Sequence, residues 1–104
     1  MIELKSDNVK LNDLSSQLLF GIFVAGGIYT KHGYDLIITS LNDSTHSVTS
    51  LHYSGNGVDF RTKNVKTQGE RKQICKEIKA ALNCDFDVIL EKDHIHMEYQ
   101  PKKR

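Results

Sequence analysis

Hydrophobic residues recur every three or four positions in two stretches of the chain, which is the spacing of a core-facing helix. In the first stretch these residues are Leu11, Leu14, Leu18, Ile22, Ala25 and Tyr29. Asn12 and Asp13 are candidate caps for this helix, and Gly26 and Gly27 weaken its end. The second helix follows a capping-box sequence at residues 67–70. Its apolar face consists of Ile74, Cys75, Ile78, Ala81 and Leu82.

The remaining apolar segments predict strands. Gly33 turns the chain into residues 34–40, whose β-branched content is typical of a buried strand. Residues 57–62 and 86–90 alternate between apolar and polar positions, as does the segment from about His94 to Tyr99. This order of elements predicts an α+β fold with a small, mainly antiparallel sheet and two main helices.

Composition narrows the class of protein. The chain has 104 residues, which corresponds to one domain over residues 1–104. A net charge of +1 gives no reason to expect nucleic acid or an anionic membrane as a partner. The uncharged run at 18–29 is shorter than the roughly 20 residues of a membrane span, and the chain has no signal-peptide pattern. We therefore expect synthesis in the cytoplasm without a signal peptide, and a monomer.

Four of the five histidines fall in two clusters. The first cluster contains His46 and His52, followed by Gly55, Gly57 and Asp59. The second contains Glu91, Asp93, His94 and His96. In the last strand, the alternation puts His94, His96 and Glu98 on the face opposite Ile95, Met97 and Tyr99. A histidine pair alone is a weak signal, but the two clusters together predict a metal site.

Catalytic zinc usually has three protein ligands from His and carboxylate side chains, with the fourth position open to water. His52, Asp59 and His96 fit this formula. A carboxylate is also needed to move the proton of the attacking water. Asp93 is the favoured base, provided that it lies in the turn before the last strand, and Glu91 is the second candidate.

The clusters resemble the superfamily that unites lysostaphin-type peptidases, D-Ala-D-Ala metallopeptidases (peptidase M15-like) and the hedgehog signalling domain. The stretch from His46-Ser47 through Ser50-Leu51-His52-Tyr53, followed by Gly55 and Val58-Asp59, is similar to hedgehog domains. Asp93-His94-Ile95-His96 looks more like D-Ala-D-Ala carboxypeptidases and phage L-alanyl-D-glutamate peptidases. Outside its first ten or so residues, the chain also resembles small phage-encoded murein peptidases. The resemblance implies a hedgehog/DD-peptidase-like fold.

The resemblance also implies roles for individual residues. His52, Asp59 and His96 would bind Zn²⁺, Asp93 would be the general base and then the acid, and His94 would lie near the activated water. His46 and Ser50 would line the substrate pocket. Arg61, on the strand face of Asp59, is a candidate for gripping a substrate carboxylate, although a surface arginine is the simpler interpretation.

The leading hypothesis is a zinc-dependent peptidase that hydrolyses an amide bond in peptidoglycan stem peptides. It could be of the DD-carboxypeptidase or the endopeptidase type, and it would act like an endolysin on the cell wall after release or as part of a virion. The alternative is a non-catalytic, zinc-stabilised hedgehog-like binding domain. Water as the fourth zinc ligand favours catalysis, and a fourth side chain favours the binding domain.

Overall fold

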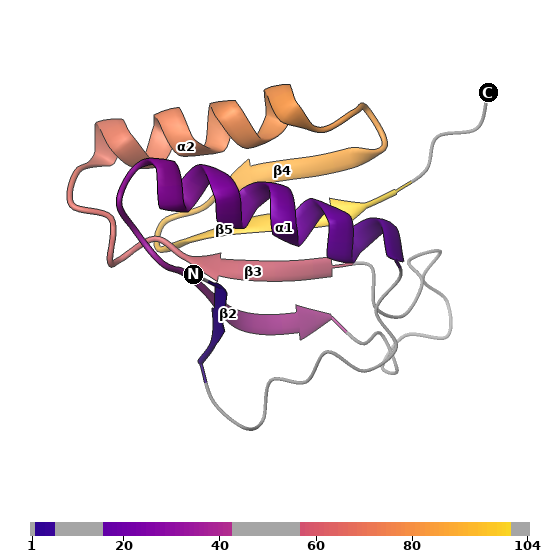
Figure 1. Ribbon diagram of the computed structural model, residues 1–104, viewed down its shortest axis with the longest axis horizontal. Helices are drawn as coiled ribbons and strands as arrows, with labels where there is room; N and C mark the ends of the chain where they lie inside the picture. Colours follow the sequence, from indigo (N-terminus) through magenta and orange to yellow (C-terminus); the bar gives the residue numbers. More distant parts are fainter. Residues whose placement is uncertain (1, 6–15, 43–56, 101–104) are drawn as a thin grey trace.

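The computed structural model describes residues 2–5, 16–42 and 57–100 (Figure 1). Within these residues the chain forms a five-stranded sheet and two helices, which confirms the α+β prediction. The elements follow in the order β1 (Ile2–Leu4), α1 (Ser16–Lys31), β2 (Leu36–Asn42), β3 (Gly57–Arg61), α2 (Gln68–Ala81), β4 (Phe86–Leu90) and β5 (His94–Tyr99).

The strands are arranged in the order β1-β2-β3-β5-β4. Every neighbouring pair is antiparallel except β1 and β2, which are parallel, so the sheet is mainly antiparallel as predicted. The sequence analysis missed β1, because three residues are too few for an alternating pattern. Both helices lie on the same face of the sheet (Figure 1), so the described helices leave the opposite face uncovered.

The core lies between this sheet and the helices. The strands contribute fully buried side chains, among them Leu36, Ile38, Val58, Phe60, Ile95 and Met97. The buried strand predicted at residues 34–40 is β2, which begins at Leu36 and is buried on one face only. In β2, Leu36 and Ile38 are buried but Ile37 and Thr39 are only half-buried, because helices cover a single face.

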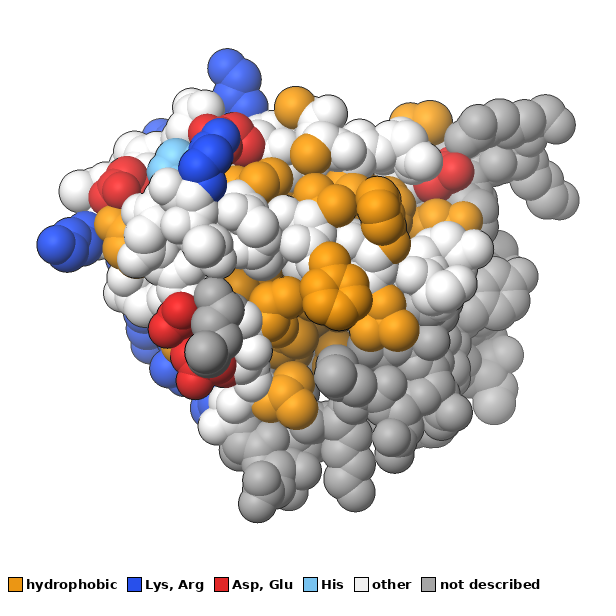
Figure 2. Space-filling model, viewed as in Figure 1, with side chains coloured by type: hydrophobic (Ala, Val, Ile, Leu, Met, Phe, Trp, Pro, Cys, Tyr) orange, Lys and Arg blue, Asp and Glu red, His pale blue; other side chains and the backbone are white. Residues whose placement is uncertain are grey.

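Helix α1 buries the predicted residues Leu18, Ile22, Ala25 and Tyr29. Leu11, Leu14 and the candidate caps Asn12 and Asp13 lie outside the described residues. The helix continues through Gly26 and Gly27 to Lys31, and Gly33 then turns the chain with a φ of 89°. Hydrophobic side chains gather over α1 on the face shown in Figure 2, and Phe20 and Phe23 are exposed.

Helix α2 begins at the predicted capping box. The Thr67 hydroxyl accepts a hydrogen bond of 3.1 Å from the backbone N–H of Glu70, which satisfies one of the free donors of the first turn. Ile74, Cys75 and Ile78 are buried as predicted, but Ala81 is exposed because the helix ends there.

An ionic cluster ties the end of α1 to α2. The Lys31 ammonium lies 2.7 Å from one carboxylate oxygen of Glu77, and the Nε2 atom of His32 lies 3.1 Å from the other. His32, the histidine outside the two sequence clusters, therefore links the end of α1 to α2. Among the described residues, no helix is both long and apolar enough to cross a membrane.

Candidate functional site

The candidate site lies on the sheet face opposite the helices. Asp59 on β3 and His96 on β5 are direct partners in the antiparallel register. Their neighbours Val58, Phe60 and Met97 point into the core, so alternation turns both polar side chains outward. His96 Nδ1 lies 2.6 Å from Asp59 Oδ1, and each side chain is about one fifth exposed, at 21% and 23% respectively.

A second carboxylate holds the other nitrogen of the same imidazole. His96 Nε2 lies 3.1 Å from Oε1 of Glu98, two residues further along β5. The hydrogen bond to Asp59 is the main cause that raises the pKa of His96 to about 9, and Glu98 adds to it against the opposing effect of burial. The ring of His96 is therefore held between two acidic groups.

Asp93 and His94 extend this polar row at the start of β5. Asp93 lies in the turn before the strand, as its predicted role requires, and its Oδ1 is 2.9 Å from Nδ1 of His94. This hydrogen bond holds the pKa of the Asp93 carboxyl below its usual range. The Nε2 atom of His94 lies 3.9 Å from Oδ1 of Asp59. An exposed carboxylate, deprotonated at neutral pH, thus stands beside the Asp59–His96 pair.

Hydrogen bonds to backbone carbonyls fix the two strand ends that carry these groups. The N–H of Thr62 donates to the carbonyl of Asp93 over 3.2 Å, which joins the end of β3 to the turn. The buried hydroxyl of Tyr29 on α1 donates to the carbonyl of Arg61 over 3.0 Å. On the other side of β3, a register shift between Ile38 and Ser40 forms a β-bulge opposite Asp59. Such bulges often re-aim side chains beside functional sites.

A hollow of about 210 Å³ opens next to Asp59. It is lined by Lys5, Thr39, Asp59, Arg61, Lys63, Asp93 and His94. Three basic side chains therefore share this small volume with two carboxylates and an imidazole. Such a mixture can bind an anionic group beside a proton acceptor.

The structure brings five of the predicted site residues to this face: Asp59, Arg61, Asp93, His94 and His96. Glu91 is exposed and does not line the hollow, but its backbone N–H donates to the carbonyl of His94 over 2.8 Å and closes the turn. Of the remaining predictions, the ligand His52 and the pocket residues His46 and Ser50 lie outside the described residues.

Sequence reasoning gave no role to Lys5, Thr39, Lys63 or Glu98. Lys5 follows a strand that was not predicted, and Thr39 is placed by a bulge that no local pattern reveals. Glu98 could have been found, because it shares the face of His94 and His96 in the alternation of β5.

The donor atoms of the Asp59–His96 pair fit a zinc ion in type, because zinc accepts imidazole nitrogen and carboxylate oxygen. Two of the three expected ligand side chains adjoin here. Across residues 2–5, 16–42 and 57–100, no group of three or more His, Cys, Asp or Glu side chains converges to hold a metal ion. A zinc ion at this pair would need a further ligand, and the one expected from the sequence, His52, lies outside the described residues.

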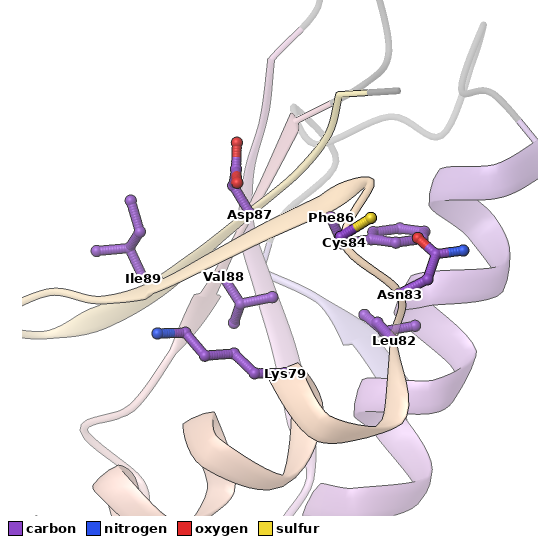
Figure 3. Close-up of a pocket in the computed structure, with 8 residues that line it drawn as sticks. All are labelled: Lys79, Leu82, Asn83, Cys84, Phe86, Asp87, Val88 and Ile89. Carbon is purple, nitrogen blue, oxygen red and sulfur yellow. The ribbon is translucent and has the colours of Figure 1, made fainter. Parts of the chain in front are cut away.

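A larger hollow of about 420 Å³ lies between the end of α2 and β4 (Figure 3). Its lining residues are Lys79, Leu82, Asn83, Cys84, Phe86, Asp87, Val88 and Ile89. Among the described residues that line it there is no imidazole, and its acidic side chain, Asp87, points away from Lys79 across β4 (Figure 3). The smaller hollow beside Asp59 is therefore the better candidate for catalysis.

Comparisons of this chain with protein-family models, with curated proteins and with solved structures found no match.

Proposed function

We propose that this chain is a zinc-dependent peptidase that hydrolyses an amide bond in peptidoglycan stem peptides, with a hedgehog/DD-peptidase-like fold. The observation that supports it is the pairing of Asp59 with His96, with Asp93 and His94 beside them on the same open sheet face. These residues come from the two histidine clusters that are far apart in the sequence. The choice of peptidoglycan as substrate comes from the resemblance of the motifs.

In this proposal, Asp59 and His96 hold the zinc ion together with His52. When bound, zinc would act as a Lewis acid that polarises the scissile carbonyl. It would also lower the pKa of water enough to provide a nucleophile at neutral pH. Asp93 accepts the proton of the attacking water, because its carboxylate is deprotonated at neutral pH and lines the hollow beside Asp59. Asp93 then donates this proton to the departing amine.

His94 has a separate role. Its Nδ1 is held by Asp93, so its Nε2 edge is directed toward Asp59 and the hollow. When it carries a hydrogen on both nitrogens, the ring donates Nε2–H from there to the carbonyl oxygen on which negative charge develops, an effect usually worth about 3–4 kcal/mol for one donor. Arg61 and the lysines of the hollow attract a carboxylate of the acidic stem peptide.

The test is hydrolysis of purified muropeptides by the zinc-loaded chain, with and without a chelator. We expect Asp93→Asn to retain zinc and to lose about 10²–10⁴-fold in kcat, since that is the usual contribution of a general base. Glu91→Gln is the matched control, because it removes a carboxylate from the same turn but not from the hollow. This control should retain activity near that of the unmodified chain.

Two outcomes would contradict the proposal. If the zinc-loaded chain is inert where a related enzyme cleaves the same muropeptides, the catalytic proposal fails and the zinc-stabilised binding domain takes its place. If Glu91→Gln loses activity while Asp93→Asn keeps it, the assignment of the base is wrong.

A further inference from the structure

Glu98 has no role in the reaction as proposed, yet it is among the least exposed acidic side chains at the site. It follows His96 by two residues on β5, so both side chains project from the outer face of the sheet. Its Oε1 lies 3.1 Å from His96 Nε2, and its side chain is 16% exposed. A half-buried carboxylate this close to an imidazole nitrogen restricts how the ring can turn.

Glu98 is itself held in place. The side-chain amide of Gln100, two residues further on, donates a hydrogen bond to its other oxygen, Oε2. On β3 the register partner of Glu98 is Gly57, which has no side chain to compete for the space above the strand. The two oxygens of the Glu98 carboxylate therefore meet different side chains, Oε2 that of Gln100 and Oε1 that of His96.

The two carboxylates bind opposite nitrogens of the His96 ring. Asp59 meets Nδ1 and Glu98 meets Nε2. An imidazole that binds a metal through one nitrogen commonly donates the N–H of the other to a carboxylate, which fixes its tautomer and orientation. Since Asp59 is the expected zinc ligand, Nδ1 is the nitrogen on the metal side and Nε2 is the one that carries the hydrogen.

We propose that Glu98 is a positioning residue, which accepts the Nε2–H of His96 and thereby presents the Nδ1 lone pair to the metal ion. This inference rests on the proposed zinc site. Glu98 acts through His96, because the imidazole ring lies between its carboxylate and Asp59. The same arrangement makes Gln100 a support for Glu98.

The test measures zinc affinity rather than turnover, by competition with a chromophoric chelator. We expect Glu98→Ala to weaken zinc binding by about 10–100-fold, the usual effect of removing such a partner. Glu98→Gln should recover most of this affinity, because its amide oxygen can still accept the Nε2–H. Asp87→Asn is the matched control, because Asp87 faces Glu98 from β4 and its substitution removes a negative charge without removing the bond to His96.

The second readout is the protonation of the His96 ring in the zinc-loaded chain, by nitrogen NMR of the imidazole. We expect a hydrogen on Nε2 and the metal on Nδ1 in the unmodified chain and in Glu98→Gln. In Glu98→Ala the ring should show mixed tautomers. Circular dichroism of each variant shows whether the fold is retained.

Three results would overturn the inference. If Glu98→Ala binds zinc within twofold of the unmodified chain with the same tautomer, Glu98 does not position the ring. If Glu98→Gln is as weak as Glu98→Ala, the carboxylate charge is needed and Glu98 is a direct ligand. If the unmodified chain binds no zinc at all, the proposed function falls together with this inference, whereas zinc binding without hydrolysis overturns the peptidase alone.

Discussion

Asp59 and His96 come from strands that are 37 positions apart in the chain, yet their side chains meet at 2.6 Å on the open face of the sheet. The register of β3 against β5 creates this contact, because it places the two residues directly opposite each other. Such a close carboxylate strongly favours the protonated imidazole.

The first prediction concerns the titration of His96 in chelator-treated protein. We expect its imidazole to stay protonated up to about pH 9, mainly because of the hydrogen bond that it donates to Asp59. Since this folded-state pKa lies above the ordinary value of 6.5, the contribution to stability is fully present below pH 6.5 and is lost as the pH rises through about 9. NMR of the imidazole protons measures the titration directly.

Asp59→Asn should bring the pKa of His96 back toward its ordinary value, whereas Asp87→Asn should leave it nearly unchanged, since Asp87 is not among the groups that shift it. Equal shifts in both variants would show that general negative charge, rather than the contact with Asp59, is responsible.

The second prediction concerns Arg61, which lines the hollow beside Asp59 and Asp93. Arg61→Gln should raise KM for an acidic stem peptide about tenfold with little change in kcat. A hydrogen bond to a charged group contributes about 1.5–3 kcal/mol, and 1.4 kcal/mol corresponds to a factor of ten. Steady-state kinetics separate the two constants. Lys66→Gln removes the same charge from an exposed position outside the hollow and should change neither.

A third prediction follows from the contact between the helices. Hydrogen bonding from Lys31, supported by Gln73 and His32, lowers the pKa of Glu77 to about 2. Because this pKa is depressed below its ordinary value of 4.5, its stabilising contribution is present above pH 4.5 and is lost as the pH falls toward 2. We expect Glu77→Gln to lower the thermal midpoint at pH 7, and the difference from the unmodified chain to disappear near pH 2.

The matched control for Glu77 is Glu91→Gln, which alters an exposed acidic side chain in the turn after β4. If the thermal midpoint of Glu77→Gln lies equally far below that of the unmodified chain at pH 7 and at pH 2, the loss comes from packing and not from the ion pair.

The fourth prediction compares the neighbouring glycines of α1. A Cβ on Gly27 meets nothing within 4 Å, so Gly27→Ala should stabilise the chain by about 0.5–1 kcal/mol through helix propensity. A Cβ on Gly26 would lie 2.6 Å from Cγ1 of Ile2, so part of β1 has to move. Gly26→Ala should therefore be less stable than Gly27→Ala by about 1–3 kcal/mol in urea denaturation, the usual cost of overpacking.

Combining Gly26→Ala with Ile2→Ala tests the cause, because the second change removes the obstructing atoms. In the Ile2→Ala background, Gly26→Ala should lower the stability by less than it does in the unmodified chain. If Gly26→Ala is harmful to the same extent with and without Ile2, the contact with β1 is not the reason.

Local patterns were enough to predict α2 and the faces of β5. The capping box at Thr67 and Glu70 depends on neighbours in sequence. In β5 the alternation of polar and apolar residues placed His94 and His96 on the face opposite Ile95 and Met97. These features arise from short-range geometry, which a sequence displays directly.

Contacts between distant segments could not be predicted in the same way. The parallel pairing of β1 with β2 and the bulge opposite Asp59 depend on how strands meet in the folded sheet. Lys5 and Thr39 reach the hollow only through these two features. The contact of His32 with Glu77 could not be predicted either, because His32 stands apart from the two histidine clusters in the sequence.

The alternation of β5 has a consequence for how this protein can change over evolution. Removing one residue from the short turn before His94 would exchange the two faces of the strand, so the imidazoles would enter the interior while Ile95 and Met97 met water. A one-residue insertion or deletion in this turn would therefore destroy the polar row and the hydrophobic packing in a single event. Substitutions in β5, by contrast, can alter one side chain of the polar row at a time and leave the core in place.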